Sequence, residues 1–302
     1  MANINICYAP NYNYAGLAAV SMASVLKNAK ESDLVNFIIL YDKTKFNSAT
    51  INKILEIKSI KDCNIRLIHV NSEIFDGYPL TNWVTVDTWF RTKVTEICPE
   101  YDKILYLDCD TLVLDSLSEL FNIDLGDNYV GVVCNCNKYF NAGVILFNTG
   151  YCNKNNLFDK VKTYIRTCKN KIKYADQDVL NIVTDGKKFE LPQEYNYCEN
   201  YFRELSPNII KQPKIIHFVG PNPNRFDCRN SNRYLWERYA KMTPFYNDFV
   251  EKNIYNLIKM YPKIKFDKLK YRLLSKILLG KSREHYKLKS IVLSNVIKEL
   301  EY

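Results

Sequence analysis

Short apolar segments alternate with segments of helical periodicity along the first part of this chain. Residues 4–9, 35–41 and 65–70 are mostly apolar runs of strand length, separated by polar turns. Residues 14–27 form an alanine-rich stretch, and residues 48–60 carry apolar side chains at helical spacing. This regular alternation of strand and helix predicts an α/β fold, in which a parallel sheet has helices on both faces.

The alternation continues through the middle of the chain. Residues 101–107 form a further apolar, strand-like run, and no internal repeat is evident. The later elements are predicted as a helix near 116–121, strands near 129–134 and 140–148, helices near 157–168 and 176–183, a strand at 214–219 and an aromatic-rich helix at 242–262.

Two acidic residues, Asp108 and Asp110, end the apolar run and are separated by one residue. In an extended strand, side chains two residues apart project to the same face, about 7 Å from one another. Two carboxylates that face one point repel each other unless a cation neutralises them. Ligands of parallel sheets bind at the carboxyl ends of strands, so we expect this pair to share a crevice with the turn at residues 9–13. The alternative is a capping pair for the helix that follows.

Composition indicates a folded protein with reduced cysteines. The 302 residues include 47% hydrophobic and 14% aromatic residues, which excludes global disorder. None of the ten cysteines forms a CxxC pair, so a zinc ribbon or disulfide scaffold is not expected. The N-terminus has no signal-peptide pattern, and no apolar segment reaches the length of about 18 residues that spans a bilayer. We therefore expect a cytoplasmic protein.

Most of the net charge of +9 lies at the C-terminus. Residues 263–302 contain eleven Lys and Arg against four acidic residues, with apolar residues between them at spacings of three and four. We therefore divide the chain into a main domain, residues 1–262, and a basic amphipathic tail that suits the surface of an anionic membrane. The alternative is a helical hairpin that packs on the main domain or on a partner subunit. The nearly neutral main domain argues against a nucleic-acid partner.

Four ordered segments carry a family resemblance. They are residues 106–113, 140–148, 174–181 and 216–220, and together they resemble the family 8 glycosyltransferases over about residues 4–226. The likeness is greatest to bacterial lipopolysaccharide and lipooligosaccharide hexosyltransferases, and glycogenin is more distant. The resemblance implies a GT-A fold with a mixed, mostly parallel sheet, a UDP-sugar donor, Mn²⁺, and transfer with retention of configuration.

A third metal ligand is expected from the histidines. His69 lies in an alternating strand pattern and His285 in the basic tail, whereas His217 ends an apolar strand before Gly220. Carboxylates with one imidazole suit Mn²⁺ or Mg²⁺. We therefore predict Asp108, Asp110 and His217 as metal ligands, and the resemblance also places a metal-binding histidine at this position. A hydrogen-bonded core histidine is the alternative.

The resemblance also assigns the donor site. It places Asn141, Asp176 and Gln177 at the transferred sugar, as catalytic residues; the alternatives are an ordinary turn around Gly143 and a simple helix start. Arg91 matches an arginine that reaches the donor, with a solvated helix face as its alternative. The full set of predicted donor-binding residues is Ala9, Pro10, Asn11, Asn13, Tyr14, Arg91, Asp108, Cys109, Asp110, Asn141, Ala142, Asp176, Gln177, His217, Gly220 and Arg225.

The chain departs from the family pattern in two places. The family follows its His-x-x-Gly motif with a lysine that holds the diphosphate, and here the sequence after Gly220 contains no lysine before Arg225. We expect Arg225 to supply this positive charge. The link at residues 132–139 is also short, which predicts an acceptor pocket that is more open or differently built.

These observations predict a retaining, metal-dependent hexosyltransferase. We expect it to move galactose or glucose from a UDP-sugar to a glycan or glycolipid acceptor, in the cytoplasm or at the inner face of the membrane. Two other functions remain open: a self-glucosylating enzyme like glycogenin, and a non-catalytic module that binds sugar nucleotides or glycans.

Overall fold

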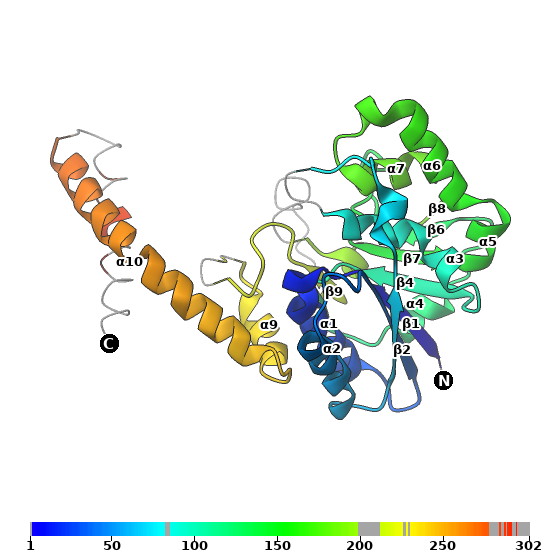
Figure 1. Cartoon of the computed structure of the whole chain (residues 1–302), viewed down its shortest axis with the longest axis horizontal. Helices are drawn as coiled ribbons and strands as arrows, with labels where there is room; N and C mark the ends of the chain where they lie inside the picture. Colours follow the sequence, from blue (N-terminus) through cyan, green and yellow to red (C-terminus); the bar gives the residue numbers. More distant parts are fainter. Residues whose placement is uncertain are drawn as a thin grey trace. The chain divides into compact units, whose positions relative to one another are not determined.

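The structure is a computed structural model of the chain, shown in Figure 1. The described residues are 2–81, 85–198, 212–225, 228, 230–277, 284, 287, 289–291 and 294. The chain separates into two compact units, Met1–Tyr246 and Asn247–Tyr302.

A seven-stranded sheet forms the centre of the first unit. Its strands are β1 (Asn3–Tyr8), β2 (Leu34–Tyr41), β3 (Asn64–His69), β4 (Lys103–Leu107), β6 (Val130–Val132), β7 (Val144–Asn148) and β8 (Lys188–Glu190). They are arranged in the order β3-β2-β1-β4-β7-β6-β8. Only β7 runs antiparallel to both neighbours, and the other described pairs are parallel. The predicted α/β class with a mixed, mostly parallel sheet is confirmed.

Helices cover both faces of this sheet (Figure 1). The α-helices of the unit are α1 (Ala15–Asn28), α2 (Ser48–Leu55), α3 (Val94–Ile97), α4 (Ser118–Asn122), α5 (Thr149–Lys154), α6 (Leu157–Cys168), α7 (Ala175–Val183) and α9 (Arg233–Ala240). The short 3₁₀ helices are η1 (Tyr12–Tyr14), η2 (Glu56–Ser59), η3 (Ser72–Phe75), η4 (Val86–Lys93), η5 (Lys169–Lys171) and η6 (Gln193–Asn196).

The two sheet faces follow from the alternation of side chains along each strand. On β1, the Tyr8 hydroxyl lies 2.9 Å from the hydroxyl of Ser21 on α1. Its neighbour Cys7 packs in the opposite core cluster, which contains Val161 of α6 and Val179 of α7. Nearly continuous apolar strands are therefore required, because both sides of the sheet are buried.

A second, two-stranded sheet brings distant segments together. Strand β5 (Thr111–Val113) pairs antiparallel with β9 (Ile215–His217), with Thr111 opposite His217. The backbone N–H of Phe218 donates to the carbonyl of Asp110 at 2.9 Å. This pairing places a histidine beside the two aspartates although about a hundred residues separate them in sequence.

The second unit contains most of a long helix, α10 (Tyr246–Ile277). This helix continues through Pro262, so it does not break at the boundary that we drew at residue 262 from the sequence. Most of the predicted tail beyond Ile277 lies outside the described residues. In the part of the chain that the structure describes, no helix is both long and apolar enough to cross a membrane.

Candidate functional site

A tight turn, rather than an extended strand, holds the two aspartates. Strand β4 ends at Leu107, and β5 begins at Thr111. The backbone N–H and the hydroxyl of Thr111 both donate to the carbonyl of Asp108, at 3.2 and 2.8 Å. The expected strand geometry at Asp108 and Asp110 is therefore wrong, because the chain turns there to leave the main sheet for β5. Their carboxylates nevertheless face a common point.

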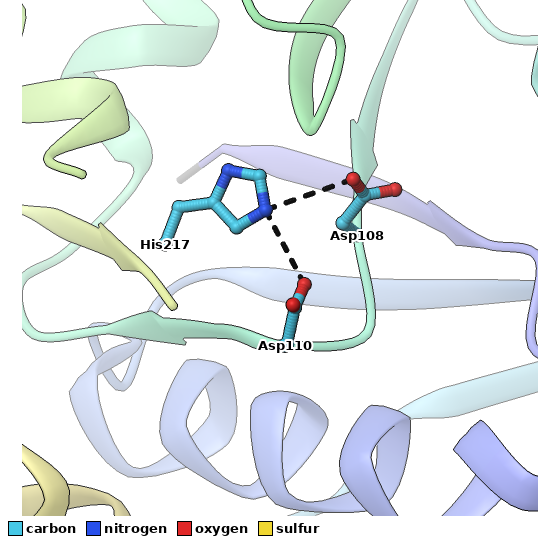
Figure 2. A group of neighbouring side chains, drawn as sticks. All are labelled: Asp108, Asp110 and His217. Carbon is cyan, nitrogen blue, oxygen red and sulfur yellow. Dashed lines mark ion pairs between the residues drawn. The ribbon is translucent and has the colours of Figure 1, made fainter. Parts of the chain in front are cut away.

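His217 faces both carboxylates from β9 (Figure 2). Its Nε2 atom lies 3.3 Å from Asp110 Oδ1 and 3.7 Å from Asp108 Oδ2. Burial alone would lower the pKa of His217, but the neighbouring Asp110 carboxylate outweighs burial and raises the pKa well above its ordinary value. In the absence of a metal ion, a proton on Nε2 would therefore occupy the position that a cation would take.

The three side chains fit a divalent cation. One ligand atom from each of Asp108, Asp110 and His217 lies within 4.8 Å of the others. Gly143 forms the wall behind them, and its backbone carbonyl accepts the N–H of Asp108 at 2.7 Å. A Cβ atom on Gly143 would lie 2.1 Å from His217 Cε1 and 2.8 Å from Asp108 Oδ2. Only glycine therefore allows the histidine and the aspartate to approach in this way.

Arg91 lies buried beside this cluster, on η4. Its guanidinium contacts Asp108 Oδ1 at 2.9 Å and Asp176 Oδ2 at 3.0 Å, and it donates to the carbonyl of Ala142 at 2.5 Å. The guanidinium carbon also lies 4.3 Å from the centre of the Tyr106 ring. Since the arginine is only 4% exposed, the alternative of a solvated helix face is wrong.

Asp176 is the buried carboxylate at the other end of this arginine. Burial raises the pKa of its carboxyl to about 6, although Arg91 lowers it and Asp108 raises it further. The residue lies in the first turn of α7, immediately after Ala175, whose φ of 47° is unusual for a residue other than glycine. Asp178 supports this turn by accepting the backbone N–H groups of Lys173 and Tyr174 at 2.7 and 2.8 Å.

A cluster of amide side chains adjoins the acidic centre, which is formed by Asp108, Asp110 and His217. The Gln177 Oε1 atom accepts the backbone N–H of Ala142 at 3.0 Å and the Asn141 Nδ2 group at 3.2 Å. Gln177 Nε2 in turn donates to the Tyr139 hydroxyl at 3.1 Å. These contacts hold polar hydrogen-bonding groups of Asn141 and Gln177 next to the predicted metal ligands.

A pocket of about 310 Å³ lies over these groups. Ten of the predicted residues line it: Ala9, Asn11, Tyr14, Arg91, Asp108, Cys109, Asp110, Ala142, Asp176 and Gln177. His217 and Asn141 stand behind this lining, joined to it through Asp110 and Gln177. Burial raises the pKa of the Cys109 thiol, so this cysteine is not an activated nucleophile.

Besides Asn141 and His217, four further predicted residues lie outside the pocket lining. Pro10 is buried and Asn13 is exposed, and both flank the turn after β1. Gly220 has a φ of 119°, which favours glycine, and turns the chain after β9. Arg225 is exposed further along this segment, so its assignment to a diphosphate stays a prediction.

Six residues that line the pocket were not among the predicted site residues, namely Thr81, Thr85, Thr88, Tyr106, Gly143 and Tyr174. Tyr106 precedes Asp108 by two positions, so the strand period could have identified it. The three threonines follow no pattern that marks a site. Asn11, by contrast, uses its side-chain oxygen to accept the N–H groups of Asn13 and Tyr14, and its Nδ2 group donates to Thr85 Oγ1 at 3.3 Å.

Comparison with known proteins identifies the family of this chain. The model of glycosyl transferase family 8 matches residues 5–222. A predicted glycosyltransferase of Haemophilus influenzae is 30% identical over 262 residues, which span 78% of each chain. The lipopolysaccharide 1,2-glucosyltransferase of Escherichia coli K12 is 25% identical over 243 residues, which span 72% of this chain and 71% of that one.

A solved structure shows the same architecture. The galactosyltransferase LgtC, in complex with donor and acceptor sugar analogs, superposes with a TM-score of 0.72 at 26% identity. The match covers 81% of this chain and 96% of LgtC. The sheet and the acidic centre at its carboxyl edge therefore define a GT-A glycosyltransferase. The chain belongs to glycosyl transferase family 8.

Replacing Gly143 by alanine should destroy the acidic centre. The added Cβ would lie 2.6 Å from His217 Nδ1, so the ring must move away from the carboxylates. We expect no detectable Mn²⁺ binding by calorimetry and a loss of about 1–3 kcal/mol in the free energy of unfolding. Gly150→Ala, where nothing lies within 4 Å of the new atom, is the control and should keep both properties. Normal Mn²⁺ affinity in Gly143→Ala would contradict the site geometry.

Divalent cations should stabilise the protein more at alkaline than at acid pH. Because the pKa of His217 is raised, its protonated form stabilises the metal-free fold below about pH 6.5, and this contribution is lost as the pH rises through the raised pKa. A cation competes with that proton. Melting curves should therefore show a larger Mn²⁺-induced rise in Tm at about pH 8 than at about pH 6. The difference should disappear in His217→Gln, and an equal rise at both pH values would oppose metal binding at His217.

Proposed function

We propose that this protein is a retaining hexosyltransferase that uses a UDP-sugar donor, a divalent cation and a glycan or glycolipid acceptor. The observation that carries the proposal is the meeting of Asp108, Asp110 and His217 at the wall of a pocket that also contains Asp176 and Gln177. The relatives named above include a lipopolysaccharide glucosyltransferase and a galactosyltransferase, which supports glucose or galactose as the transferred hexose.

The acidic centre would hold the donor through its diphosphate. Asp108, Asp110 and His217 would hold Mn²⁺ or Mg²⁺, and the charge of the ion would stabilise the departing UDP. Arg91 holds Asp108 in place, because its buried guanidinium forms an ion pair with Asp108 Oδ1 at 2.9 Å. Arg225 lies on the segment after Gly220 and is the proposed replacement for the missing lysine.

The amide cluster would orient the transferred sugar. Asn141, Asp176 and Gln177 present amide and carboxylate groups that can hydrogen-bond sugar hydroxyls, and the backbone N–H groups of Ala142 and Gly143 hold two of these side chains in place. Fixed donors and acceptors of this kind stabilise a transition state without reorganising. We therefore assign Asn141, Asp176 and Gln177 to the reacting sugar.

The turn after β1 would receive the nucleoside. Both acceptor positions of the Asn11 side-chain oxygen are used by backbone N–H groups, and one N–H of its Nδ2 group donates to Thr85 Oγ1, which leaves the second N–H of Nδ2 for a ligand. An amide N–H suits a carbonyl oxygen of uracil. Ala9 and Tyr14 line the same end of the pocket, and Pro10 and Asn13 fix the turn around them.

The basic tail would bring the enzyme to an anionic membrane. On α10, Phe266, Leu269 and Leu273 are 67%, 56% and 51% exposed, and their spacing of three and four residues places them on one side of the helix. Lys263, Lys270 and Arg272 are also exposed on this helix. An exposed apolar stripe with neighbouring basic residues suits a lipid surface.

Hydrolysis of UDP-sugars provides the central test. We expect slow UDP release from UDP-glucose or UDP-galactose in the presence of Mn²⁺, and none with a chelator. Asp110→Asn should lower this rate by about 100-fold or more, because it removes a charged ligand without changing its size. Asp127→Asn, at an exposed position, serves as the control and should retain the wild-type rate.

The same assay separates the alternatives. A non-catalytic module would bind UDP-sugars without releasing UDP. A self-glucosylating enzyme would gain the mass of hexose units on its own chain, which mass spectrometry detects. Release of UDP together with an unchanged protein mass supports transfer to a separate acceptor.

Removing residues 263–302 should abolish sedimentation with anionic vesicles while UDP-sugar hydrolysis continues. A second variant, in which Phe266, Leu269 and Leu273 are replaced by serine, retains the helix and should weaken the same interaction, since burying each of these side chains contributes about 1.5–3 kcal/mol. Neutral vesicles form the control. A truncated protein that still sediments with anionic vesicles would refute the membrane role of the tail.

A further inference from the structure

We infer that Asn196 is a positioning residue, which fixes the ring of His217 and connects the metal-binding side of the site to its sugar-binding side. The inference rests on the metal-dependent activity proposed above. Asn196 is 2% exposed and does not line the pocket, so it would act through other residues.

The backbone holds Asn196 beside β9. The residue ends η6, and the next residue, Tyr197, forms a parallel bridge with Ile216. The N–H of Tyr197 donates to the carbonyl of Ile215 at 2.8 Å, and the N–H of His217 donates to the carbonyl of Tyr197 at 2.9 Å. These two hydrogen bonds fix the distance between the Asn196 side chain and the His217 ring.

The direction of the Asn196 amide follows from its neighbours. The backbone N–H of Gly143 donates to Asn141 Oδ1 at 2.9 Å, which identifies this atom as an acceptor. Asn196 Nδ2 lies 3.3 Å from the same oxygen and 3.5 Å from the Asn141 carbonyl. Because both contacts require a donor, the amide nitrogen of Asn196 faces Asn141 and its oxygen faces His217.

This orientation sets the tautomer of His217. Asn196 Oδ1 lies 3.2 Å from His217 Nδ1, so it accepts a hydrogen bond from an Nδ1–H group. The lone pair for a cation is then on Nε2, the nitrogen that faces Asp108 and Asp110 in Figure 2. Cys198 Sγ is 3.9 Å from Nδ1 but 3.5 Å from Asn196 Oδ1, so the thiol can donate to the same oxygen.

Hydrogen bonds continue from Asn196 to the proposed sugar site. Asn196 donates to Asn141, Asn141 donates to Gln177, and Gln177 donates to Tyr139. Each amide has a fixed direction, since backbone N–H groups of Gly143 and Ala142 identify the acceptor oxygens of Asn141 and Gln177. Loss of Asn196 should therefore affect both the metal ligand and the groups that face the sugar.

Two variants separate these effects in the full-length protein. Asn196→Ala removes both contacts, and we expect Mn²⁺ affinity, measured by calorimetry, to fall about 10–100-fold, with a lower kcat. Asn196→Asp keeps an acceptor for His217 Nδ1 but cannot donate to Asn141. It should regain most of the Mn²⁺ affinity while kcat remains low.

The matched control is Asn36→Ala. Asn36 is also buried, and its amide is hydrogen-bonded on both sides, to Asn5 and Asn64, on neighbouring strands of the main sheet. Its loss should lower the stability of the protein and leave Mn²⁺ affinity unchanged. Wild-type Mn²⁺ affinity in a folded Asn196→Ala variant would overturn the inference.

A metal-free measurement tests the inference independently of folding in the variants and of the proposed activity. Nitrogen NMR of the histidine rings in the wild-type protein, at a pH above the raised pKa of His217 so that the ring is neutral, should show the proton on Nδ1 and none on Nε2. Protonation on Nε2 alone would overturn the role of Asn196. If the Nδ1–H tautomer is present but UDP-sugar hydrolysis is absent, the proposed function fails and the positioning of the ring does not.

Discussion

The pairing of buried Arg91 with Asp108 and Asp176 is the interaction on which the rest of the site depends. Both carboxylates lie at the carboxyl edge of the sheet, and the guanidinium is held by the carbonyl of Ala142 as well. Removing one partner of such a buried pair typically costs about 3–5 kcal/mol, because the other charge loses its compensation. Three carboxylates, with Asp110 as the third, and one guanidinium still leave an excess of negative charge. A divalent cation beside His217 would balance this charge, and in its absence a proton on His217 does so in part.

Close packing behind the acidic centre fixes the positions of its charged side chains. The Gly143 backbone supports Asp108 through its carbonyl and Asn141 through its N–H, and the space beside it is occupied by the His217 ring. A side chain at this position has no room, so the ligands cannot relax toward a looser arrangement. Buried polar groups are tolerated here because each donor among the amides meets an acceptor. The metal ligands and the proposed sugar-binding groups are thus parts of one hydrogen-bonded unit.

The sequence predicted the fold well, since the alternation of apolar strands and amphipathic helices is a local property. It also predicted that Asp108, Asp110 and His217 lie together, because their residue types and positions after apolar runs point to one site, and the fold brings the three side chains together. The β5–β9 pairing was not predictable, since short strands of three residues have no distinctive periodicity. Asn196 was missed for a related reason: a single buried amide acquires its role only from neighbours that are distant in sequence. The strand geometry assumed at Asp108 failed because the chain must leave the main sheet to reach β9.

Burial divides the site into a fixed part and an exposed rim. Arg91, Asp176 and His217 are each about 4% exposed, whereas Tyr174, which lines the same pocket, is 64% exposed. Every UDP-sugar presents the same diphosphate, whichever hexose it carries. A buried, rigid scaffold that positions a metal and this diphosphate can therefore be the same throughout the family. The choice between glucose and galactose depends on one hydroxyl, and one or two hydrogen bonds are enough to make it. Side chains at the rim can change without disturbing the buried pairs, which is consistent with relatives at 25% and 26% identity whose names specify glucose in one case and galactose in the other.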